Sequence, residues 1–570
     1  MISKTYETKI KQKLEYIFGN NSQNIYKKLE SVLEQFKSQN NPEYKLTQKD
    51  VFLITYGDSL LSDNETPLSS LDKFAKKYFK EIFSYIHILP FYPYSSDDGF
   101  SVINYYKVNP ELGDWSDIHV LSKSFKLMFD GVINHISAKS DWFQAYLKGD
   151  PDFKDYFIEI DEEDDVSQVF RPRALPLATA FKTVNGEKKI WTTFSEDQID
   201  LNFKSEDVFI EIIKVLLFYV ANGAKAIRLD AIGFMWKKLG TNCIHLPETH
   251  KVIQLYKDIF EALKCDTLII TETNVPHKDN ISYFGNGYNE AQLVYNFSLP
   301  PLTLYSIITG DASILSQWLS NLSTPSDETT FFNFLSSHDG IGVVPTHGIL
   351  SDQQRDIIEK RVLENGGFVS YKNLSDGSKI PYEMNINYLD AVSDRSFNLD
   401  DNIKRFVLAN SVLLSIIGVP AVYIHSILGS ANYSAGVEKT GMNRTINREK
   451  LETSEVQTQL QDVNSKRHKV FARLSQLIKV RKAYKAFHPN SPQKVLNLDA
   501  NVLAIIRGDE NDKILYLANF SNKKLNIQID TNILGNIEVL TDIMQDKVYK
   551  ANNGLFDISL EVAEFVWLKL

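Results

Sequence analysis

The sequence predicts an α/β protein whose largest part is a (β/α)8 barrel, the TIM barrel. Eight short apolar runs alternate with helix-like segments along the middle of the chain, which is the signal for parallel βα units. No solenoid-type repeat period competes with this pattern. With 570 residues, 43% of them hydrophobic, the chain is long enough for a large core and for more than one domain.

The predicted strands are short runs rich in Val, Ile, Leu and Phe. In chain order they are residues 51–55, 85–89, 126–132, 226–229, 268–271, 292–297, 331–335 and 421–424. Residues 71–83, 208–220 and 252–263 lie between them and have apolar positions at helical spacing. This order of elements predicts that the strands close into one barrel with helices around it.

Further segments lie before, within and after the barrel, which we assign to residues 48–490. Residues 1–47 carry two amphipathic patterns and predict an N-terminal helical extension. Two connections are too long for simple crossovers: residues 136–200 after strand three, and residues 340–400 after strand seven. Both insertions leave from the carboxyl ends of strands, where barrel enzymes build their pockets. Residues 491–570 have short strands with polar turns and predict a C-terminal β-domain.

Composition excludes several classes of partner. The 62 basic and 72 acidic residues give a formal charge of −10, and no basic run is interleaved with aromatics, so we expect no nucleic-acid partner. Cys243 and Cys265 cannot form a disulfide framework, which suits a reducing compartment. The first residues lack a signal-like apolar segment, and no stretch has the length of a membrane span. We expect a cytoplasmic enzyme, monomeric or homodimeric, acting on small molecules.

Strand four ends in two charged residues. Strand alternation places Arg228 and Asp230 on the same side, where an unpaired buried charge would be very costly. A structural ion pair is one interpretation. The other is a carboxylate nucleophile that a neighbouring guanidinium keeps ionised.

Other strand ends favour the second interpretation. In a closed barrel the carboxyl ends of the strands converge on one mouth, so polar residues that follow different strands come together. After strands three, five and seven these residues are Asp130, Asn134, His135, Glu272, His338 and Asp339. So many carboxylates at one mouth indicate an active site.

Two carboxylates at one mouth define a type of chemistry. Glycosyl transfer with retention uses one ionised carboxylate as nucleophile and one carboxylic acid about 5–5.5 Å away as acid and base. Asp230, beside Arg228, is the predicted nucleophile. Glu272 follows apolar residues and faces a second anion, and both effects raise a carboxyl pKa. Asp339 is placed to orient sugar hydroxyls and to favour a cationic transition state.

Residues 130–135, 228–231, 271–273 and 337–339 resemble the four sequence regions of the α-amylase superfamily, glycoside hydrolase family 13. The resemblance extends over nearly the whole barrel. It implies that Asp230 is the nucleophile, Glu272 the general acid/base and Asp339 the transition-state stabiliser. It also implies that His135 and His338 contact the glucosyl hydroxyls.

More stretches narrow the resemblance to the sucrose-phosphorylase subfamily, whose members cleave an α-glucoside with inorganic phosphate to give α-glucose 1-phosphate. They are residues 86–91, 96–100, 171–173, 299–302, 338–343 and 446–448. By this resemblance Asp97 and Arg448 clamp the glucosyl 4-hydroxyl and Phe100 stacks on the ring. The same resemblance implies that Arg173 and Tyr382 hold phosphate, and Arg171 is a second candidate.

The resemblance also implies that the protein uses no metal and no organic cofactor. Asn134, the Asn of the first region, often ligates calcium in true amylases, but the phosphorylase branch does not use that ion. Inorganic phosphate is then a co-substrate.

The acceptor is predicted from whole loops. The N-terminal extension and residues 171–176, 271–280, 425–430, 436–439 and 444–450 resemble the glucosylglycerate phosphorylases of this subfamily. Glycerate carries a carboxylate and therefore needs positive or donor groups beyond those that hold glucose. The candidates are His277, Lys278, Arg444 and Arg448, although Lys278 is equally well explained as a solvated loop charge.

Glu383 argues partly against glycerate as the acceptor. Glu383 stands where sucrose phosphorylases usually have Gln, and as an anion it would repel a carboxylate unless it pairs with a cation or accepts from a glycerate hydroxyl. Sucrose, sucrose 6-phosphate and glucosylglycerol therefore remain alternative substrates. A hydrolase and a catalytically silent amylase-like binding protein are the alternatives to a phosphorylase.

Overall fold

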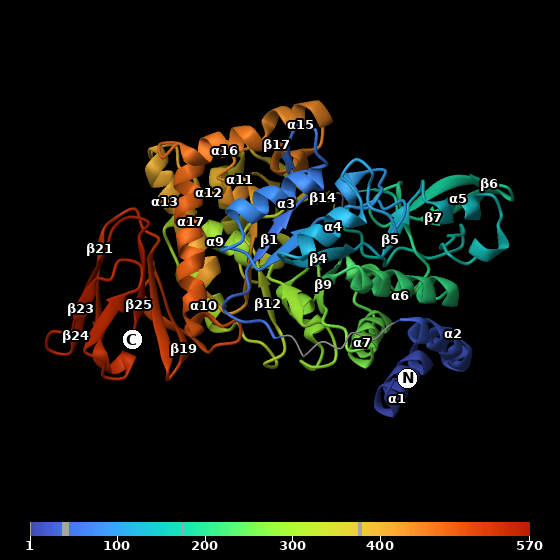
Figure 1. Cartoon of the computed structure of the whole chain (residues 1–570), viewed down its shortest axis with the longest axis horizontal. Coiled ribbons are helices and arrows are strands. Elements are labelled where there is room, and N and C mark those ends of the chain that lie inside the picture. Colours follow the sequence, from blue (N-terminus) through green and yellow to red (C-terminus); the bar gives the residue numbers. More distant parts are fainter. Residues whose placement is uncertain (1, 37–44, 174, 374–378) are drawn as a thin grey trace.

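The computed structural model describes residues 2–36, 45–173, 175–373 and 379–570. Eight parallel strands form a closed barrel in the order β1-β16-β12-β11-β10-β9-β4-β3, which confirms the predicted (β/α)8 fold (Figure 1). The barrel strands are β1 (Phe52–Thr55), β3 (Tyr85–Ile88), β4 (Lys126–Gly131), β9 (Ala224–Leu229), β10 (Leu268–Thr271), β11 (Leu293–Tyr295), β12 (Thr330–Asn333) and β16 (Val419–Tyr423). Each predicted strand overlaps one of these.

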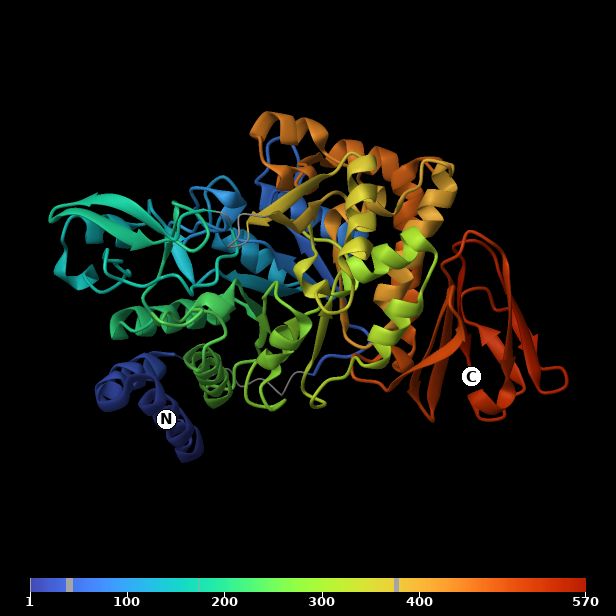
Figure 2. The ribbon, with the colours of Figure 1, turned by 180° about the vertical axis from the view of Figure 1, so that it is seen from behind.

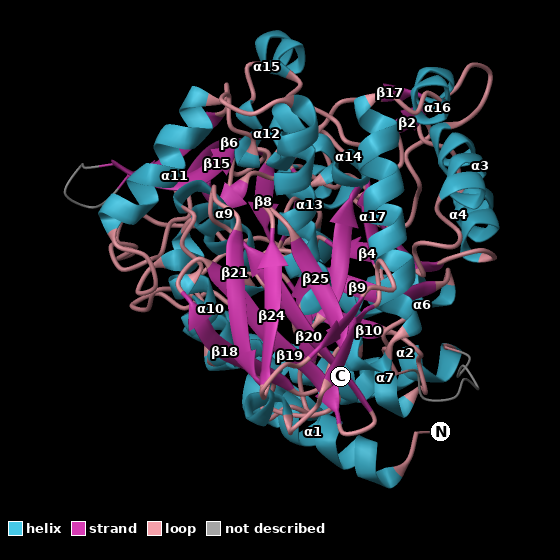
Figure 3. Cartoon of the chain, turned by 90° about the vertical axis from the view of Figure 1, so that its left-hand side faces the viewer, coloured by secondary structure: helices cyan, strands magenta, loops and turns pink. Residues whose placement is uncertain are grey.

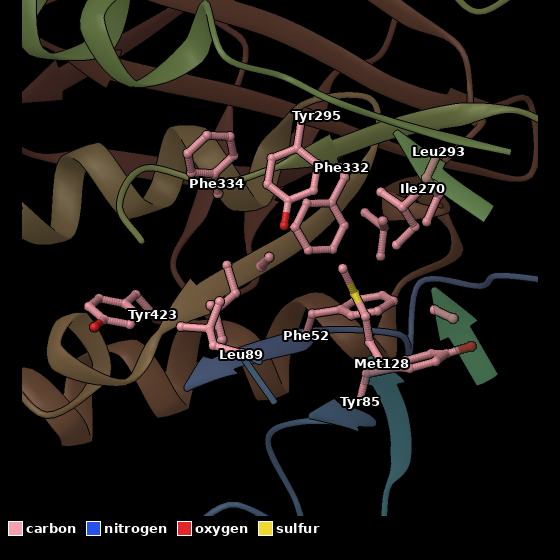
Figure 4. Packing of buried hydrophobic residues seen from close by; sticks show 14 of the residues in the cluster. Phe52, Tyr85, Leu89, Met128, Ile270, Leu293, Tyr295, Phe332, Phe334 and Tyr423 are labelled. Atoms are coloured by element: carbon pink, nitrogen blue, oxygen red, sulfur yellow. The ribbon is translucent and has the colours of Figure 1, made fainter. Parts of the chain in front are cut away.

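Aromatic side chains fill much of the barrel interior (Figure 4). The rings of Phe52 and Tyr85 stack with centroids 4.0 Å apart, and Phe332 meets Phe52 edge-on at 5.1 Å. Tyr295 continues the cluster, 4.6 Å from Phe332. A barrel of this size is a packed core and not a pore, so the site must lie at its mouth.

Helices follow most of the strands and cover the outside of the barrel. They are α3 (Pro67–Tyr78), α4 (Trp115–Ser122), α6 (Glu206–Ala221), α7 (Pro247–Ala262), α9 (Leu299–Thr309), α10 (Ser313–Ser320), α13 (Leu399–Ser415) and α17 (Lys466–Ala483). After β10 the crossover is reduced to the single turn α8 (His277–Asn280) and a 3₁₀ turn. Within the described residues no helix is long and apolar enough to cross a bilayer.

The first insertion projects from one side of the barrel (teal in Figure 1). Its elements are β5 (His135–Ser137), α5 (Asp141–Leu147), β6 (Ala178–Thr183), β7 (Gly186–Trp191) and β8 (Gln198–Asp200). The second insertion contains β13 (Ile341–Gly342), α11 (Asp352–Glu364), β14 (Phe368–Asn373), β15 (Lys379–Asn385) and α12 (Tyr388–Val392). Strands β13, β15 and β14 form one antiparallel sheet.

Two helices, α1 (Lys4–Phe18) and α2 (Ser22–Gln35), precede the barrel and contact α7 and α6. Lys13 forms an ion pair with Asp258 of α7, and the Phe18 ring meets Phe209 of α6 edge-on at 5.0 Å. The apolar stripe of this extension is therefore buried against the outer helices of the barrel, away from the strand ends.

The C-terminal residues form a β-domain that faces the viewer in Figure 3. Its larger sheet contains β18 (Gln493–Asp499), β19 (Val502–Asp509), β20 (Asp512–Asn519), β25 (Phe565–Lys569), β22 (Val539–Asp542) and β23 (Val548–Lys550), and its smaller one β21 (Leu525–Asp530) and β24 (Leu555–Leu560). The buried Arg507 joins the domain to the barrel by donating to the Ser415 carbonyl oxygen at 2.8 Å. The domain has a hydrophobic core of its own.

Three short helices lie between β16 and α17: α14 (Ile424–Ile427), α15 (Ser434–Thr440) and α16 (Thr453–Gln461). The segment between α15 and α16 carries two arginines, Arg444 and Arg448, back over the mouth of the barrel, where both contact residues that follow β12. This connection therefore contributes to the site although it is far from the other site residues in the sequence.

Candidate active site

One buried guanidinium is surrounded by three carboxylates at the mouth of the barrel. Arg228, only 2% exposed, donates through Nη1 to Asp130 and to Asp230 Oδ1, the latter at 2.9 Å. Its Nη2 lies 3.7 Å from Glu272 Oε2. Strand register produces this arrangement, because Arg228 of β9 pairs with Asp130 of β4, and Glu272 follows the neighbouring strand β10.

The residue after Asp230 has an unusual backbone. Ala231 adopts a left-handed φ of 47°, which is strained for a residue with a Cβ, and its N–H donates to Glu272 Oε2 at 3.0 Å. This turn holds the two carboxyl groups on the same side of Arg228. The ion pair between Arg228 and Asp230 is therefore present, and the prediction that Asp230 is the nucleophile is compatible with the same arrangement.

The two carboxyl groups differ in protonation. Burial raises the pKa of Glu272 to about 7, with the Asp230 carboxylate adding to the rise and Arg228 opposing it. Burial also raises the pKa of Asp230, against the lowering effect of Arg228. We assign the proton to Glu272, because only Asp230 has a direct 2.9 Å contact with the guanidinium. This is the division of roles that retaining glycosyl transfer needs.

A second buried arginine at the mouth, Arg448, also contacts several carboxylates. Arg448 places Nη1 2.7 Å from Asp98 Oδ2 and 3.5 Å from Asp97 Oδ1, and Nη2 3.5 Å from Asp339 Oδ1. Its Nε donates to the His338 carbonyl oxygen at 2.9 Å. Three carboxylates from two distant parts of the chain thus converge on one arginine.

A tight turn aims the carboxylates of Asp97 and Asp98 at Arg448. Both residues have left-handed φ values, 51° and 48°, and Gly99 follows with φ 113°. A Cβ on Gly99 would lie 2.5 Å from the Pro90 carbonyl oxygen, so this position requires glycine. Asp98 was not among the predicted site residues. Its position beside Asp97 in the same motif was the available signal.

Phe100, which is predicted to stack on the sugar ring and is called the sugar platform below, directly follows this turn. The Phe100 ring stacks on the His338 ring at 4.8 Å with an interplanar angle of 6°. Although burial opposes ionisation, Arg448, Arg444 and Arg173 lower the pKa of Asp97 to about 2, so its carboxylate is charged. An aromatic face beside an ionised carboxylate suits the two surfaces of a sugar ring, apolar C–H groups and hydroxyl donors.

His135 is fixed by its neighbours in the insertion. Its Nε2 lies 2.9 Å from the Phe100 carbonyl oxygen, which also accepts from Gln198 Nε2 at 3.0 Å. Burial lowers the pKa of His135, so the ring is neutral and donates through Nε2. The structure therefore brings the predicted sugar contacts Phe100, His135 and His338 together at the mouth.

A buried ammonium lies behind His135. Lys237 places Nζ 2.8 Å from Asn134 Oδ1 and 2.6 Å from Asp200 Oδ2. Asn134 is the residue whose counterpart in true amylases often ligates calcium, and here its oxygen accepts from a lysine. Among the described residues no cluster of His, Cys, Asp and Glu is arranged to hold a metal ion. Sequence reasoning missed Lys237, because a single lysine after a strand carries no signal.

The predicted phosphate residues differ in position. Arg173 Nη2 lies 3.5 Å from Asp97 Oδ2, and its guanidinium is 5.6 Å from the centre of the Phe194 ring. Burial raises the pKa of Tyr382 to about 12, with Arg444 and Arg173 opposing, so its hydroxyl is a proton donor. Arg171 is exposed and donates to the carbonyl oxygen of Leu175 in its own loop. The structure brings Arg173 to the site and leaves Arg171 outside it.

Glu383 is paired, which answers the question that the sequence left open. Arg444 donates to it through Nε at 3.0 Å and Nη2 at 2.7 Å, and Arg444 Nη1 lies 2.9 Å from Asp339 Oδ1. Glu383 is only 3% exposed. Gly340 permits this contact, because a Cβ there would lie 2.5 Å from the Met384 carbonyl oxygen. A bidentate pair of this kind removes most of the repulsion that a lone carboxylate would exert.

His277, a predicted acceptor contact, lies in the outer layer of the fold. Its ring lies 6.1 Å from the Phe331 ring and 5.9 Å from the Trp318 ring of α10. Phe332, the next residue along β12, faces the barrel interior, so Phe331 faces the outer helices, and His277 is held there with it. Lys278 is exposed on α8, and no described contact joins it to the charged cluster.

Comparison with known proteins agrees with this geometry. Residues 74–360 match the model of the α-amylase catalytic domain. The chain is 46% identical over 502 residues to a glucosylglycerate phosphorylase of Allomeiothermus silvanus, covering 88% of this chain and 90% of that protein. It is 45% identical over 524 residues to a glucosylglycerate phosphorylase of Escherichia coli K12, covering 92% of each.

More distant relatives lie in the same subfamily. A sucrose phosphorylase of Agrobacterium vitis is 30% identical over 463 residues, covering 77% of this chain and 88% of that protein. The crystal structure of sucrose 6F-phosphate phosphorylase from Thermoanaerobacter thermosaccharolyticum has a TM-score of 0.73 and 26% identity, covering 91% of this chain and 99% of that one. The predicted family is confirmed. The chain belongs to the α-amylase family, glycoside hydrolase family 13, within the branch that contains these glycoside phosphorylases.

Proposed function

We propose that the protein catalyses the reversible phosphorolysis of 2-O-α-D-glucosyl-D-glycerate to α-D-glucose 1-phosphate and D-glycerate. The observation that carries the proposal is the Arg228 centre, which pairs with the nucleophile Asp230 and lies beside a buried Glu272. The choice of glycerate is supported by 44–46% identity to three glucosylglycerate phosphorylases. The proposal includes a cytoplasmic location, no metal and no organic cofactor.

The reaction proceeds by two displacements at the anomeric carbon. In the first, an Asp230 oxygen bonds to that carbon, the bond to the glycerate oxygen breaks, and Glu272 gives its proton to that oxygen. In the second, a phosphate oxygen attacks, its proton goes to Glu272, and Asp230 leaves as a carboxylate. Two inversions return the α configuration. Asp339 stabilises the positive charge that develops on the ring in both steps.

Phosphate must be held beside anionic groups, so the site needs a fixed cation with free donors. Arg173 fits, because its only described carboxylate contact is the 3.5 Å one to Asp97. The neutral Tyr382 hydroxyl can donate to the same anion.

We expect Arg173→Ala to raise the KM for phosphate roughly tenfold or more, since a charge-assisted hydrogen bond is lost, and to change hydrolysis of the same glucoside much less. Initial rates at varied phosphate concentrations give this comparison. Arg171→Ala removes an exposed arginine from the same loop and is the matched control. An unchanged KM for phosphate would move the phosphate site elsewhere.

The acceptor is tested in the reverse direction. With α-glucose 1-phosphate as donor, we expect phosphate release to be fastest with D-glycerate, clearly slower with glycerol and slowest with fructose. Glycerate and glycerol differ in the carboxylate, so their ratio measures recognition of that group. A preference for fructose would assign the protein to the sucrose phosphorylases, and release in water alone at the same rate would make it a hydrolase.

A further inference from the structure

We propose that Lys372 of β14 binds the carboxylate of the acceptor. Lys372 is then a determinant of acceptor specificity; this inference rests on the proposed function. The other cations at the mouth have their charge taken up. Arg228 contacts three carboxylates, Arg448 three, and Arg444 two. Arg173 is the one we assign to phosphate. A carboxylate on the acceptor needs a further partner.

The sheet of the second insertion carries both Lys372 and Glu383. Ser370 of β14 pairs directly with Glu383 of β15, the carboxylate that holds Arg444. Lys372 pairs with Ile380 on the same two strands. Lys372 lies two residues beyond Ser370, so the two positions are about 7 Å apart along the strand. A bulge between residues 370 and 371 bends the strand here.

The first insertion meets Lys372 from the other side. Its Nζ lies 4.2 Å from the centre of the Phe170 ring. From Phe170 a row of aromatic rings leads to the sugar platform: Phe234 at 6.1 Å, then Phe194 at 5.3 Å, then His135 at 5.4 Å. Figure 2 shows the hairpin of the second insertion, in yellow, extending towards the first insertion, in teal. Lys372 thus lies at the outer end of a wall that begins at the glucosyl subsite.

The charge of Lys372 is available for a ligand. Among the residues that the structure describes, no carboxylate pairs with Lys372, and burial lowers the pKa of its ammonium without any carboxylate that opposes the effect. A half-buried ammonium against an aromatic ring gains a charge-assisted hydrogen bond when a carboxylate arrives. The carboxylate of glycerate is joined to the attacking oxygen through a carbon, so in this proposal it extends beyond the position of phosphate to Lys372.

The test uses Lys372→Met in the full-length protein, with α-glucose 1-phosphate as donor. We expect the KM for D-glycerate to rise roughly tenfold to a hundredfold, because one charge-assisted contact is lost. We expect the rate with glycerol and the KM for phosphate in phosphorolysis to change less than about twofold. The ratio of kcat/KM for glycerate to that for glycerol is the decisive number.

Two further variants complete the test. Lys372→Arg keeps the charge and should restore most of the affinity for glycerate. Lys278→Met removes an exposed lysine of α8 and should leave every constant unchanged. An unaltered glycerate-to-glycerol ratio in Lys372→Met overturns the inference, and so does an equal rise in the KM for phosphate. The proposed function fails separately, if the wild-type protein itself does not prefer glycerate.

Discussion

Replacing Asp230 with Asn is expected to lower kcat/KM for glucosyl transfer by roughly four orders of magnitude or more, while the protein stays folded. The amide has no ionised oxygen with which to attack the anomeric carbon, and it cannot form a stable glycosyl ester. The volume of the side chain is almost unchanged, and Arg228 keeps its contacts with Asp130 and Glu272. Stopped-flow kinetics with an activated glucosyl donor measures formation of the covalent intermediate directly.

A shortened variant sharpens this test. Asp230→Gly leaves space on the face of the sugar from which Asp230 attacks, so added azide should enter there and give β-glucosyl azide from an activated α-glucosyl donor. A single displacement inverts the configuration, whereas the wild-type protein retains it. Activity of Asp230→Asn within tenfold of wild type, or an α-configured azide product, would contradict the assignment of Asp230 as nucleophile.

The second large effect is expected from Glu272→Gln. With glucosylglycerate, whose leaving oxygen needs a proton, the first step should slow by about 10²–10⁴-fold. With α-glucosyl fluoride, whose leaving group needs no proton, it should be nearly unaffected. Equal losses with both substrates would show that Glu272 is not the acid.

The pH profile gives an independent readout of the same residue. Glu272 must be protonated in the first step, and its pKa is raised to about 7, so kcat/KM for glucosylglycerate should be high below that pH and fall as the pH rises through it. In Glu272→Gln this descending limb should disappear, because the amide does not titrate. A limb that persists in the variant would assign the titration to another group.

The barrel strands could be predicted from the sequence for a physical reason. Strands that are buried on both faces appear as continuous apolar runs, and β1, β3 and β10 are fully buried along their whole length. Barrel closure then brings their carboxyl ends to one mouth whatever the details of the loops. The association of Asp130 with Arg228 follows from strand register, and Asp230 and Glu272 come directly after the paired strands β9 and β10.

The positions of the side chains in the loops could not be predicted in the same way. The sequence predicts that the segment after Glu272 supplies His277 and Lys278 to the mouth, but a single helical turn directs His277 to the outer layer between Phe331 and Trp318. Motif resemblance identifies a loop and does not fix the direction in which each of its side chains points. The same limit applies to Arg171, which bonds within its own loop while Arg173 reaches Asp97.

By itself the sequence determined the barrel, the family and the meeting of several carboxylates at one mouth, because these depend on local burial patterns and on strand ends that must converge. Only the tertiary structure decided which charges pair. Arg448 meets Asp97 across 351 positions, and Arg444 neutralises Glu383 across 61. Such partners are chosen by the packing of three segments over one mouth: the turn after β3, the second insertion, and the connection between α15 and α16. Each buried charge there must find a counter-charge, and no periodicity in the chain records that choice.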